Sequence, residues 1–159
     1  MPLTVARSDV YINQRRRAWA NIDSMGNPLA EASDEFREFW TERRICLLAT
    51  VEPDGTPHVI AVGVTIDIEN GLARVIAGRT SKKIRNVLAH GESGARASVT
   101  GHDGGRRYST LQGLAHVRLD RESVAEAERR YAQRYRVPRE NPDRAVLEIA
   151  VDHLLGSVG

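Results

Sequence analysis

The sequence predicts a mainly β fold of the α+β class, a closed or split β-barrel with peripheral helices. Three observations predict it: six stretches rich in apolar and β-branched residues, tight-turn sequences between them, and helical patterns confined to the connections. A chain of 159 residues, 41% of them hydrophobic, can bury one sizeable core. We place this domain at residues 33–159, after an N-terminal extension, residues 1–32, that shows no convincing period.

The domain is predicted to begin with an amphipathic helix. Ser33 is a typical N-cap residue, and two acidic residues follow it in the first turn, where the helix dipole favours negative charge. Phe36, Phe39 and Trp40 then recur on one face. We therefore expect a helix that ends near Arg43 and buries its aromatic face.

A β-meander is predicted to follow this helix, with strands at residues 45–51, 56–67 and 72–77. Pro53-Asp54-Gly55 and Asn70-Gly71 supply the turn residues between these strands. The remaining predicted elements are a short helix capped by Ser81, a strand at 95–100, a strand at 106–119, a helix from Asp120 to about Arg136, and a last strand at 145–151.

The strand at 106–119 alternates between two kinds of side chain. One face is apolar, and the opposite face is polar. A polar face opposite a core face usually lies in water, and it would equally serve a polar ligand. The apolar face carries Leu111, Gly113, Ala115, Val117 and Leu119, and the polar face Tyr108, Thr110, Gln112 and His116.

The stretch from Ala77 to Asn86 has the features of an anion site. A β-type run breaks at Gly78 and restarts as a helix, whose first-turn N–H groups are unpaired and whose dipole is positive there. Ser81 is placed to cap this helix. A phosphate is the expected ligand, and the alternative is a capped surface helix with solvated charges. The cations of the block are Arg79, Lys82, Lys83 and Arg85.

The predicted strand at 56–67 offers a second binding feature. Its two faces differ, because one is uniformly large and apolar whereas the other shrinks toward a mid-strand glycine. The small face can let a flat ring or another backbone approach; the alternative is a strand buried on both sides against a dimer partner. The large face carries Ile60, Val62, Val64 and Ile66, and the small face Val59, Ala61, Gly63 and Thr65.

Composition limits the remaining possibilities. The net charge is +2 with a pI near 9.0, and arginines cluster locally, which suits a polyanionic small molecule or a nucleic acid. Nucleic-acid binding ranks lowest, because only 5% of residues are aromatic and stacking platforms are therefore few. No run of about 18 apolar residues suggests a membrane span, and no signal peptide is evident, so we expect a cytoplasmic protein without membrane partners.

The sequence offers no obvious catalytic constellation. It shows no triad arrangement, no His/Cys metal spacing and no paired carboxylates near the two binding features, so we expect no metal. Cys46 lies in an apolar run and is predicted to be a buried structural thiol. The five histidines lie singly in the sequence. His58, near the start of the predicted strand at 56–67, is a weak catalytic candidate.

Several motifs taken together resemble a known family. Their order and spacing, from about Phe36 to Ser157, resemble the split-barrel flavin and deazaflavin proteins of the pyridoxamine-phosphate-oxidase-like superfamily, and especially its coenzyme F-420-dependent biliverdin reductases. The motifs are Ala49-Thr50-Val51, the run from Asp54 through Asp67, the block from Arg79 to Asn86, Leu111-Gln112-Gly113, the run from Ala127 to Arg136, and Leu155-Gly156-Ser157.

The resemblance implies an FMN-binding-protein-like split barrel that forms a homodimer and binds F-420, a deazaflavin, at the subunit interface. In that family the cofactor phosphate is held by the block that falls here on Arg79, Ser81 and Lys83, with Asn86 one turn on. The ring lies along the second strand, which implies contacts to His58, Val59, Ile60 and Ala61, with Thr50 nearby.

The implied activity is hydride transfer from reduced F-420 to a conjugated, anionic acceptor, with a linear tetrapyrrole such as biliverdin the first candidate. Arg107, Tyr108, Gln112 and Arg134 are predicted to contact the substrate or the second subunit. Two other readings stay open. One is an FMN-dependent oxidase or oxidoreductase, because the phosphate block would serve both cofactors; the other is a non-catalytic cofactor-binding or storage module.

Overall fold

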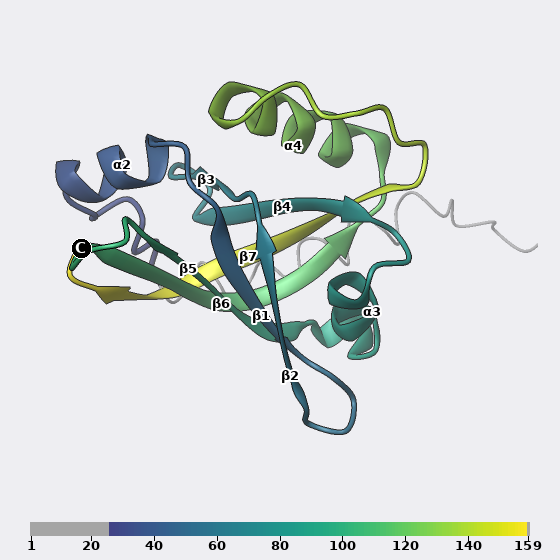
Figure 1. Ribbon diagram of the computed structural model, residues 1–159. Helices are drawn as coiled ribbons and strands as arrows, with labels where there is room; N and C mark the ends of the chain where they lie inside the picture. The colour runs from purple at the N-terminus through teal and green to yellow at the C-terminus, as the bar shows by residue number, and fades with distance from the viewer. Residues whose placement is uncertain (1–25, 159) are drawn as a thin grey trace, which may run out of the picture.

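The computed structural model describes residues 26–158 (Figure 1). Most of the extension predicted at residues 1–32, including its arginine cluster at 15–17, lies outside this range. The elements are α2 (Asp34–Thr41), β1 (Cys46–Val51), β2 (Pro57–Val62), β3 (Thr65–Asp67), β4 (Leu72–Gly78), α3 (Lys82–Leu88), the 3-10 turn η1 (Gly91–Ser93), β5 (Ala95–His102), β6 (Tyr108–Arg118), α4 (Arg121–Arg134) and β7 (Arg144–Gly156).

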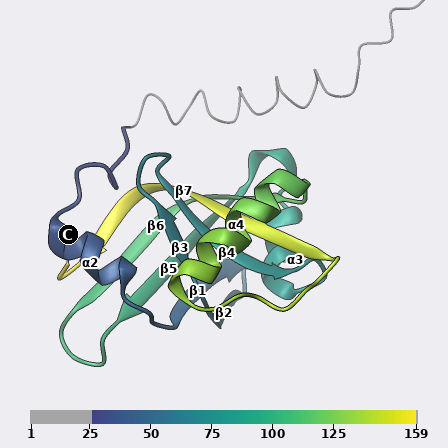
Figure 2. The same ribbon diagram turned by 90° about the horizontal axis from the view of Figure 1, so that it is seen from above.

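The predicted fold class is confirmed. Seven strands form one sheet in the order β2-β1-β5-β6-β7-β4-β3, with antiparallel pairing throughout, and the helices lie at its periphery (Figures 1 and 2). Both long-helix caps are also as predicted. Ser33 Oγ accepts from the amide of Phe36 at 3.1 Å, and Asp120 Oδ1 accepts from that of Ser123 at 2.9 Å.

The strand predicted at 56–67 is wrong in one respect, because the chain breaks at Gly63 and Val64 into two strands. β2 pairs with β1 at one edge of the sheet, and β3 pairs with β4 at the other edge. Since only two residues connect β2 to β3, the two edges must approach each other. The sheet is therefore rolled into a barrel that is split between these edges.

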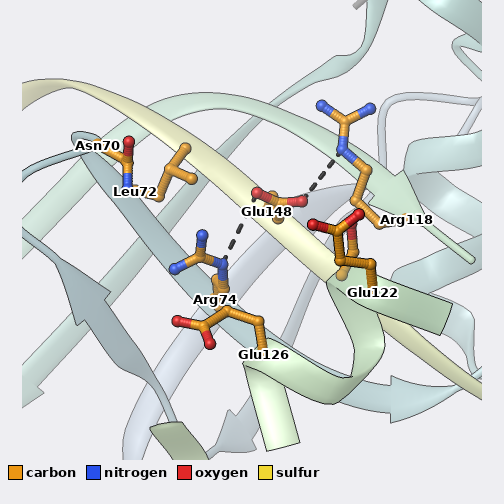
Figure 3. Close-up of a pocket in the computed structure, with 8 residues that line it drawn as sticks. Asn70, Leu72, Arg74, Arg118, Glu122, Glu126 and Glu148 are labelled. Atoms are coloured by element: carbon orange, nitrogen blue, oxygen red, sulfur yellow. Dashed lines mark hydrogen bonds and ion pairs between the residues drawn. The ribbon is translucent and has the colours of Figure 1, made fainter. Parts of the chain in front are cut away.

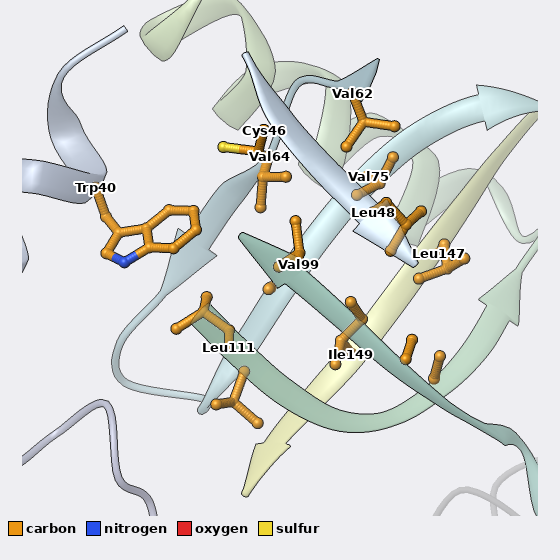
Figure 4. Packing of buried hydrophobic residues seen from close by; sticks show 14 of the residues in the cluster. Trp40, Cys46, Leu48, Val62, Val64, Val75, Val99, Leu111, Leu147 and Ile149 are labelled. Carbon is orange, nitrogen blue, oxygen red and sulfur yellow. The ribbon is translucent and has the colours of Figure 1, made fainter. Parts of the chain in front are cut away.

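The core fills the inside of this barrel (Figure 4). Trp40 lies at one end of it, and its indole nitrogen donates to Ser109 Oγ at 3.0 Å, so the buried polar edge of the ring is satisfied. Phe36 and Phe39 are buried with it, as predicted. Fully buried side chains of the surrounding strands include Leu48, Val64, Val75, Val99, Leu111, Leu147 and Ile149.

The C-terminal end of α4 holds the break between β2 and β3. Tyr135 Oη accepts from the amide of Val64 at 2.9 Å and donates to the carbonyl of Arg44 at 2.8 Å. The guanidinium of Arg134 donates to the carbonyls of Val64 and Glu42. Main-chain groups that lose their strand partners at the break are thus paired with side chains of α4.

Gly63, at the break, leaves room for the rings of two tyrosines from the C-terminal end of α4. A Cβ on Gly63 would lie 2.8 Å from Cε2 of Tyr131 and 3.2 Å from the ring of Tyr135. The flat groups next to Gly63 are therefore the protein's own tyrosines, whose rings stack with centroids 4.9 Å apart. The predicted small face also ends here, because Thr65 is buried whereas Val59 is 56% exposed.

We expect Gly63→Val to lower the free energy of unfolding by about 1–3 kcal/mol, since the branched side chain must displace the tyrosine rings. Urea unfolding monitored by fluorescence measures the loss. The same substitution in a Tyr131→Leu background should cost clearly less, because the nearer ring edge is gone. Equal costs in the two backgrounds would show that the tyrosine contact does not explain the glycine.

A chain of charges fastens α4 to the outside of the sheet, around a pocket of about 390 Å³ (Figure 3). The Glu148 carboxylate, on β7, lies 3.1 Å from Nε of Arg118 and 3.7 Å from Nε of Arg74. Arg74 also bonds Asp67 at 2.8 Å, and Asp67 lies 3.2 Å from Arg130 of α4. Alternating charges thus connect four strands to the helix.

Candidate functional site

The predicted anion block forms the start of α3. Ser81 occupies the N-cap with φ −66° and ψ 151°, but its side chain makes no capping bond, so the predicted side-chain cap is wrong. The first-turn amides of Ile84 and Arg85 bond instead to the Ser81 carbonyl. The hydroxyl is buried and has no partner among residues 26–158. A buried hydroxyl in this state is available to a ligand.

The two lysines of the block differ in their surroundings. Lys82 lies 2.7 Å from Glu52 and is largely exposed. Lys83 is half-buried and forms no ion pair within the described part of the chain, and its burial lowers its pKa. Arg79 and Arg85 are exposed. Lys83 is therefore the cation of this block whose desolvation an anionic ligand would offset most.

A polar contact connects this helix to the neighbouring strands. Asn86 of α3 donates to Thr50 Oγ1 at 3.0 Å, and both residues are buried. Thr50 pairs with His58 across β1 and β2, so these two side chains share a face of the sheet. Nδ1 of His58 is buried without a partner within residues 26–158. The structure thus brings the predicted residues Thr50, His58 and Asn86 together beside α3.

β2 is an edge strand with two accessible faces. Ile60 is 39% exposed, so it is not the core residue that the strand pattern predicted, whereas Val62 on the same face is buried. Val59 and Ala61 lie on the opposite face, next to Ala49 and Leu47 of β1. The small outward-facing side chains predicted there are present and uncovered within the described structure.

A second pocket, of about 280 Å³, lies in the split of the barrel. We refer to it as the split pocket. Its wall includes β2, the second half of β4, the first turn of α3, α4 with the segment that follows it, and the start of β7. The lining residues are Ala61, Val62, Gly63, Ile76, Lys83, Tyr131, Arg136, Pro138, Arg139 and Arg144.

The four residues predicted to contact substrate or the second subunit lie elsewhere. Arg107 stands between Glu35, Glu42 and Asp103 at 3.5 to 3.9 Å, close to α2. Tyr108, beside it at the start of β6, is 47% exposed. Gln112 lies mid-strand on the outer face of β6, level with Ser98 and His153.

Arg134 is the most constrained of these four. Burial lowers the pKa of its guanidinium, which is engaged by the main-chain carbonyls at the strand break. These contacts favour a structural role over binding of a free ligand. The arginines that line the split pocket are Arg136, Arg139 and Arg144, and of these only Arg136 belongs to a motif noted in the sequence, the run from Ala127 to Arg136.

The other titratable groups fit a supporting role. Cys46 is buried, as predicted, and burial raises the pKa of its thiol. Among residues 26–158, no three His, Cys, Asp or Glu side chains are arranged to hold a metal ion. None of the helices in this range has both the length and the apolar content needed to cross a lipid bilayer.

Comparison with known proteins agrees with this geometry. The family model described as pyridoxamine 5'-phosphate oxidase matches residues 32–156, most of the chain. A curated relative, the F420H(2)-dependent biliverdin reductase of Mycobacterium tuberculosis (strain CDC 1551 / Oshkosh), is 40% identical over 134 residues. This alignment covers 84% of the present chain and 94% of the relative.

Solved structures support the same fold. An F420 reductase superposes with a TM-score of 0.61 at 21% identity, covering 77% of this chain and 98% of that one. HutZ, a heme storage protein from Vibrio cholerae, gives a TM-score of 0.61 at 18% identity, covering 79% and 94%. At these identities the likeness concerns the fold alone. The sequence match over the whole barrel, together with this topology, makes the chain a member of the pyridoxamine 5'-phosphate oxidase family.

Proposed function

We propose that this protein is an F-420-dependent oxidoreductase that passes hydride from the reduced deazaflavin to a conjugated, anionic acceptor, with biliverdin the first candidate. The observation that carries the proposal is the 40% identity to a F420H(2)-dependent biliverdin reductase over 94% of that relative. Because the alignment spans 134 of the 159 residues, it includes the α3 block and β2.

The residues beside α3 fit such a cofactor. The Ser81 hydroxyl and Nδ1 of His58 are buried without partners among residues 26–158, and Lys83 is a half-buried cation without a carboxylate there. We assign the cofactor phosphate to Arg79, Ser81 and Lys83. Contacts to its ring are assigned to β2, from His58 through Val59 and Ile60 to Ala61, with Asn86 and Thr50 behind them.

The deazaflavin, when bound, supplies hydride and handles single electrons and oxygen poorly, because carbon replaces the reactive flavin nitrogen. The protein then has three tasks: to bind the anionic groups, to orient the acceptor and to exclude water. The Thr50–Asn86 bond fixes α3 against β1 and thereby the position of the anion block. His58 remains a weak candidate for proton donation, because its ring borders the assigned site.

A homodimer is part of the proposal. The outer face of β1 and β2 exposes Leu47 at 45%, Val51 at 42% and Val59 at 56%, which together form an apolar surface at a sheet edge. A second copy of the chain would cover this surface, and sedimentation velocity measures the resulting mass. A cytoplasmic location also stays a proposal.

The test of the activity is a mixture of protein, reduced F-420 and biliverdin, observed by absorbance. We expect oxidation of the deazaflavin together with loss of the long-wavelength band of the tetrapyrrole. NADPH should not replace F-420, because the chain has no strand-linked Gly-x-Gly-x-x-Gly. Tight F-420 binding without turnover on any conjugated acceptor would favour a storage module. Turnover with FMN and oxygen alone would favour an FMN-dependent oxidase or oxidoreductase.

The two lysines of α3 give a matched test of the phosphate assignment. Lys83→Ala should weaken F-420 binding about 10- to 100-fold, since it removes a charge-assisted contact of about 1.5–3 kcal/mol. Lys82→Ala removes the same charge one residue away from a side chain that already pairs with Glu52, and it should change the Kd little. Fluorescence titration gives both values, and equal effects of the two substitutions would refute the assignment.

A further inference from the structure

The split pocket has an unusual balance of charge. Its wall carries four cations, Lys83, Arg136, Arg139 and Arg144, and no carboxylate. Arg144 is engaged within the protein, because its Nε lies 3.0 Å from Glu128 Oε1 and its Nη2 donates to the carbonyl of Arg139. Arg144 thus fixes the segment after α4 and holds Arg139 at the pocket.

The other three cations lack such a partner. Lys83, Arg136 and Arg139 form no ion pair within residues 26–158, and both arginines are exposed. Lys83 borders the pocket but is assigned to the cofactor phosphate, which leaves the two arginines for a second anionic group. A ligand that brings negative charge into the split pocket would be favoured by both arginines.

Apolar side chains form the smaller part of this wall. Ala61, Val62 and Ile76 come from the strands, and Tyr131 and Pro138 from α4 and the segment beyond it. Figure 2 shows this segment running back along the side of α4 that is nearer to β1 and β2. A cationic pocket with a small apolar part suits a group that ends in a carboxylate and has some carbon surface beside it.

The size of the split pocket limits its occupant. About 280 Å³ accommodates one ring with its acidic side group, whereas a whole linear tetrapyrrole would extend beyond it. Ala61 lines the pocket and also belongs to the exposed face of β2, so the two surfaces are continuous. A carboxylate bound in the split pocket would therefore hold the acceptor next to the strand assigned to the cofactor ring.

We propose that Arg136 and Arg139 form a carboxylate subsite that binds an acidic side group of the acceptor. The proposal rests on the proposed function, since it concerns the substrate of that same site. It assigns acceptor recognition to the segment after α4, whose two arginines present planar guanidinium groups suited to carboxylates. Arg134, one of the four residues predicted to contact the substrate or the second subunit, instead bonds the carbonyls at the strand break.

The test is the binding of biliverdin and of its dimethyl ester, in the presence of saturating oxidised F-420 so that no turnover occurs. We expect the wild type to bind the free acid at least about tenfold more tightly than the ester, as one charge-assisted contact predicts. The double variant Arg136→Ala/Arg139→Ala should bind both at the level of the ester. Difference absorbance supplies the Kd values, and circular dichroism checks the fold.

Arg121→Ala is the matched control. It removes the same kind of exposed side chain at the first residue of α4, which does not line the split pocket, and it should leave the preference for the acid unchanged. Equal wild-type affinity for acid and ester, or no binding of either, would overturn the subsite. Loss of F-420 affinity in the double variant with an unchanged acid preference would also overturn it, because the arginines would then serve the cofactor.

The outcomes separate this inference from the proposed function. Arginine-dependent binding of biliverdin without its reduction by reduced F-420 would refute the reductase and leave the subsite intact. Reduction of the acid and the ester with equal KM values would refute the subsite and leave the reductase intact.

Discussion

Gly113→Ala should destabilise the protein by at least about 3 kcal/mol, at the upper end of the cost of overpacking. A Cβ at this position would lie 1.9 Å from the carbonyl oxygen of Ala150 and 2.6 Å from its carbonyl carbon. These are backbone atoms of the adjacent strand, which no change of side-chain rotamer can move aside. A loss of this size is a large fraction of the stability of a single domain.

Gly78→Ala is the control for Gly113→Ala. Both glycines lie in strands, but a Cβ on Gly78 would meet no atom within 4 Å, so its replacement should change the stability by no more than about 0.5 kcal/mol. Denaturant unfolding of the two variants measures the difference. A similar, small change in both would mean that β6 and β7 adjust freely at Gly113.

Local signals in the sequence predicted those elements whose cause is local. The cap at Ser33, the aromatic face at Phe36 to Trp40 and the cap at Asp120 each depend on residues within one helical turn. The faces of β6 follow from strict alternation, and Leu111, Gly113 and Ala115 are buried as predicted.

The break at Gly63 and Val64 could not be predicted in the same way. The alternating apolar pattern runs through it without interruption, so the sequence indicates one long strand. The break depends on partners distant in sequence, because β3 pairs with β4 while Tyr135 bonds Val64 across 71 residues. Contacts of this range override local strand propensity.

The same limitation affected the candidate site. The phosphate block and β2 are each a single continuous stretch of the sequence. The types and the order of their residues could therefore predict both features. The split pocket is assembled from β2, β4, α3, α4 with the segment after it, and β7, and its arginines are identical in type to those on the surface of α4. Only the fold distinguishes Arg134, which bonds the carbonyls of the strand break, from Arg136, which borders the pocket.

Asp67→Asn should lower the stability at neutral pH by about 3 kcal/mol, the low end for breaking a buried ion pair. Asp67 is 2% exposed, and the change removes the charge opposite both Arg74 and Arg130. Each arginine keeps a second carboxylate, Glu148 for Arg74 and Glu126 for Arg130, which limits the loss.

The effect of Asp67→Asn should depend on pH in a definite direction. Burial alone would raise the pKa of Asp67, but hydrogen bonds from Asn70 and Arg74 and the charge of Arg130 outweigh it and hold the pKa below 3.8. A carboxyl whose pKa is lower in the folded state contributes stability above its unfolded pKa, and this contribution disappears as the pH falls through the folded value. The difference between wild type and Asp67→Asn should therefore be constant from pH 7 to about 5 and narrow below about 4. Urea unfolding at a series of pH values measures it, and a difference that stayed constant to pH 3 would show that the Asp67 charge does not hold α4 on the sheet.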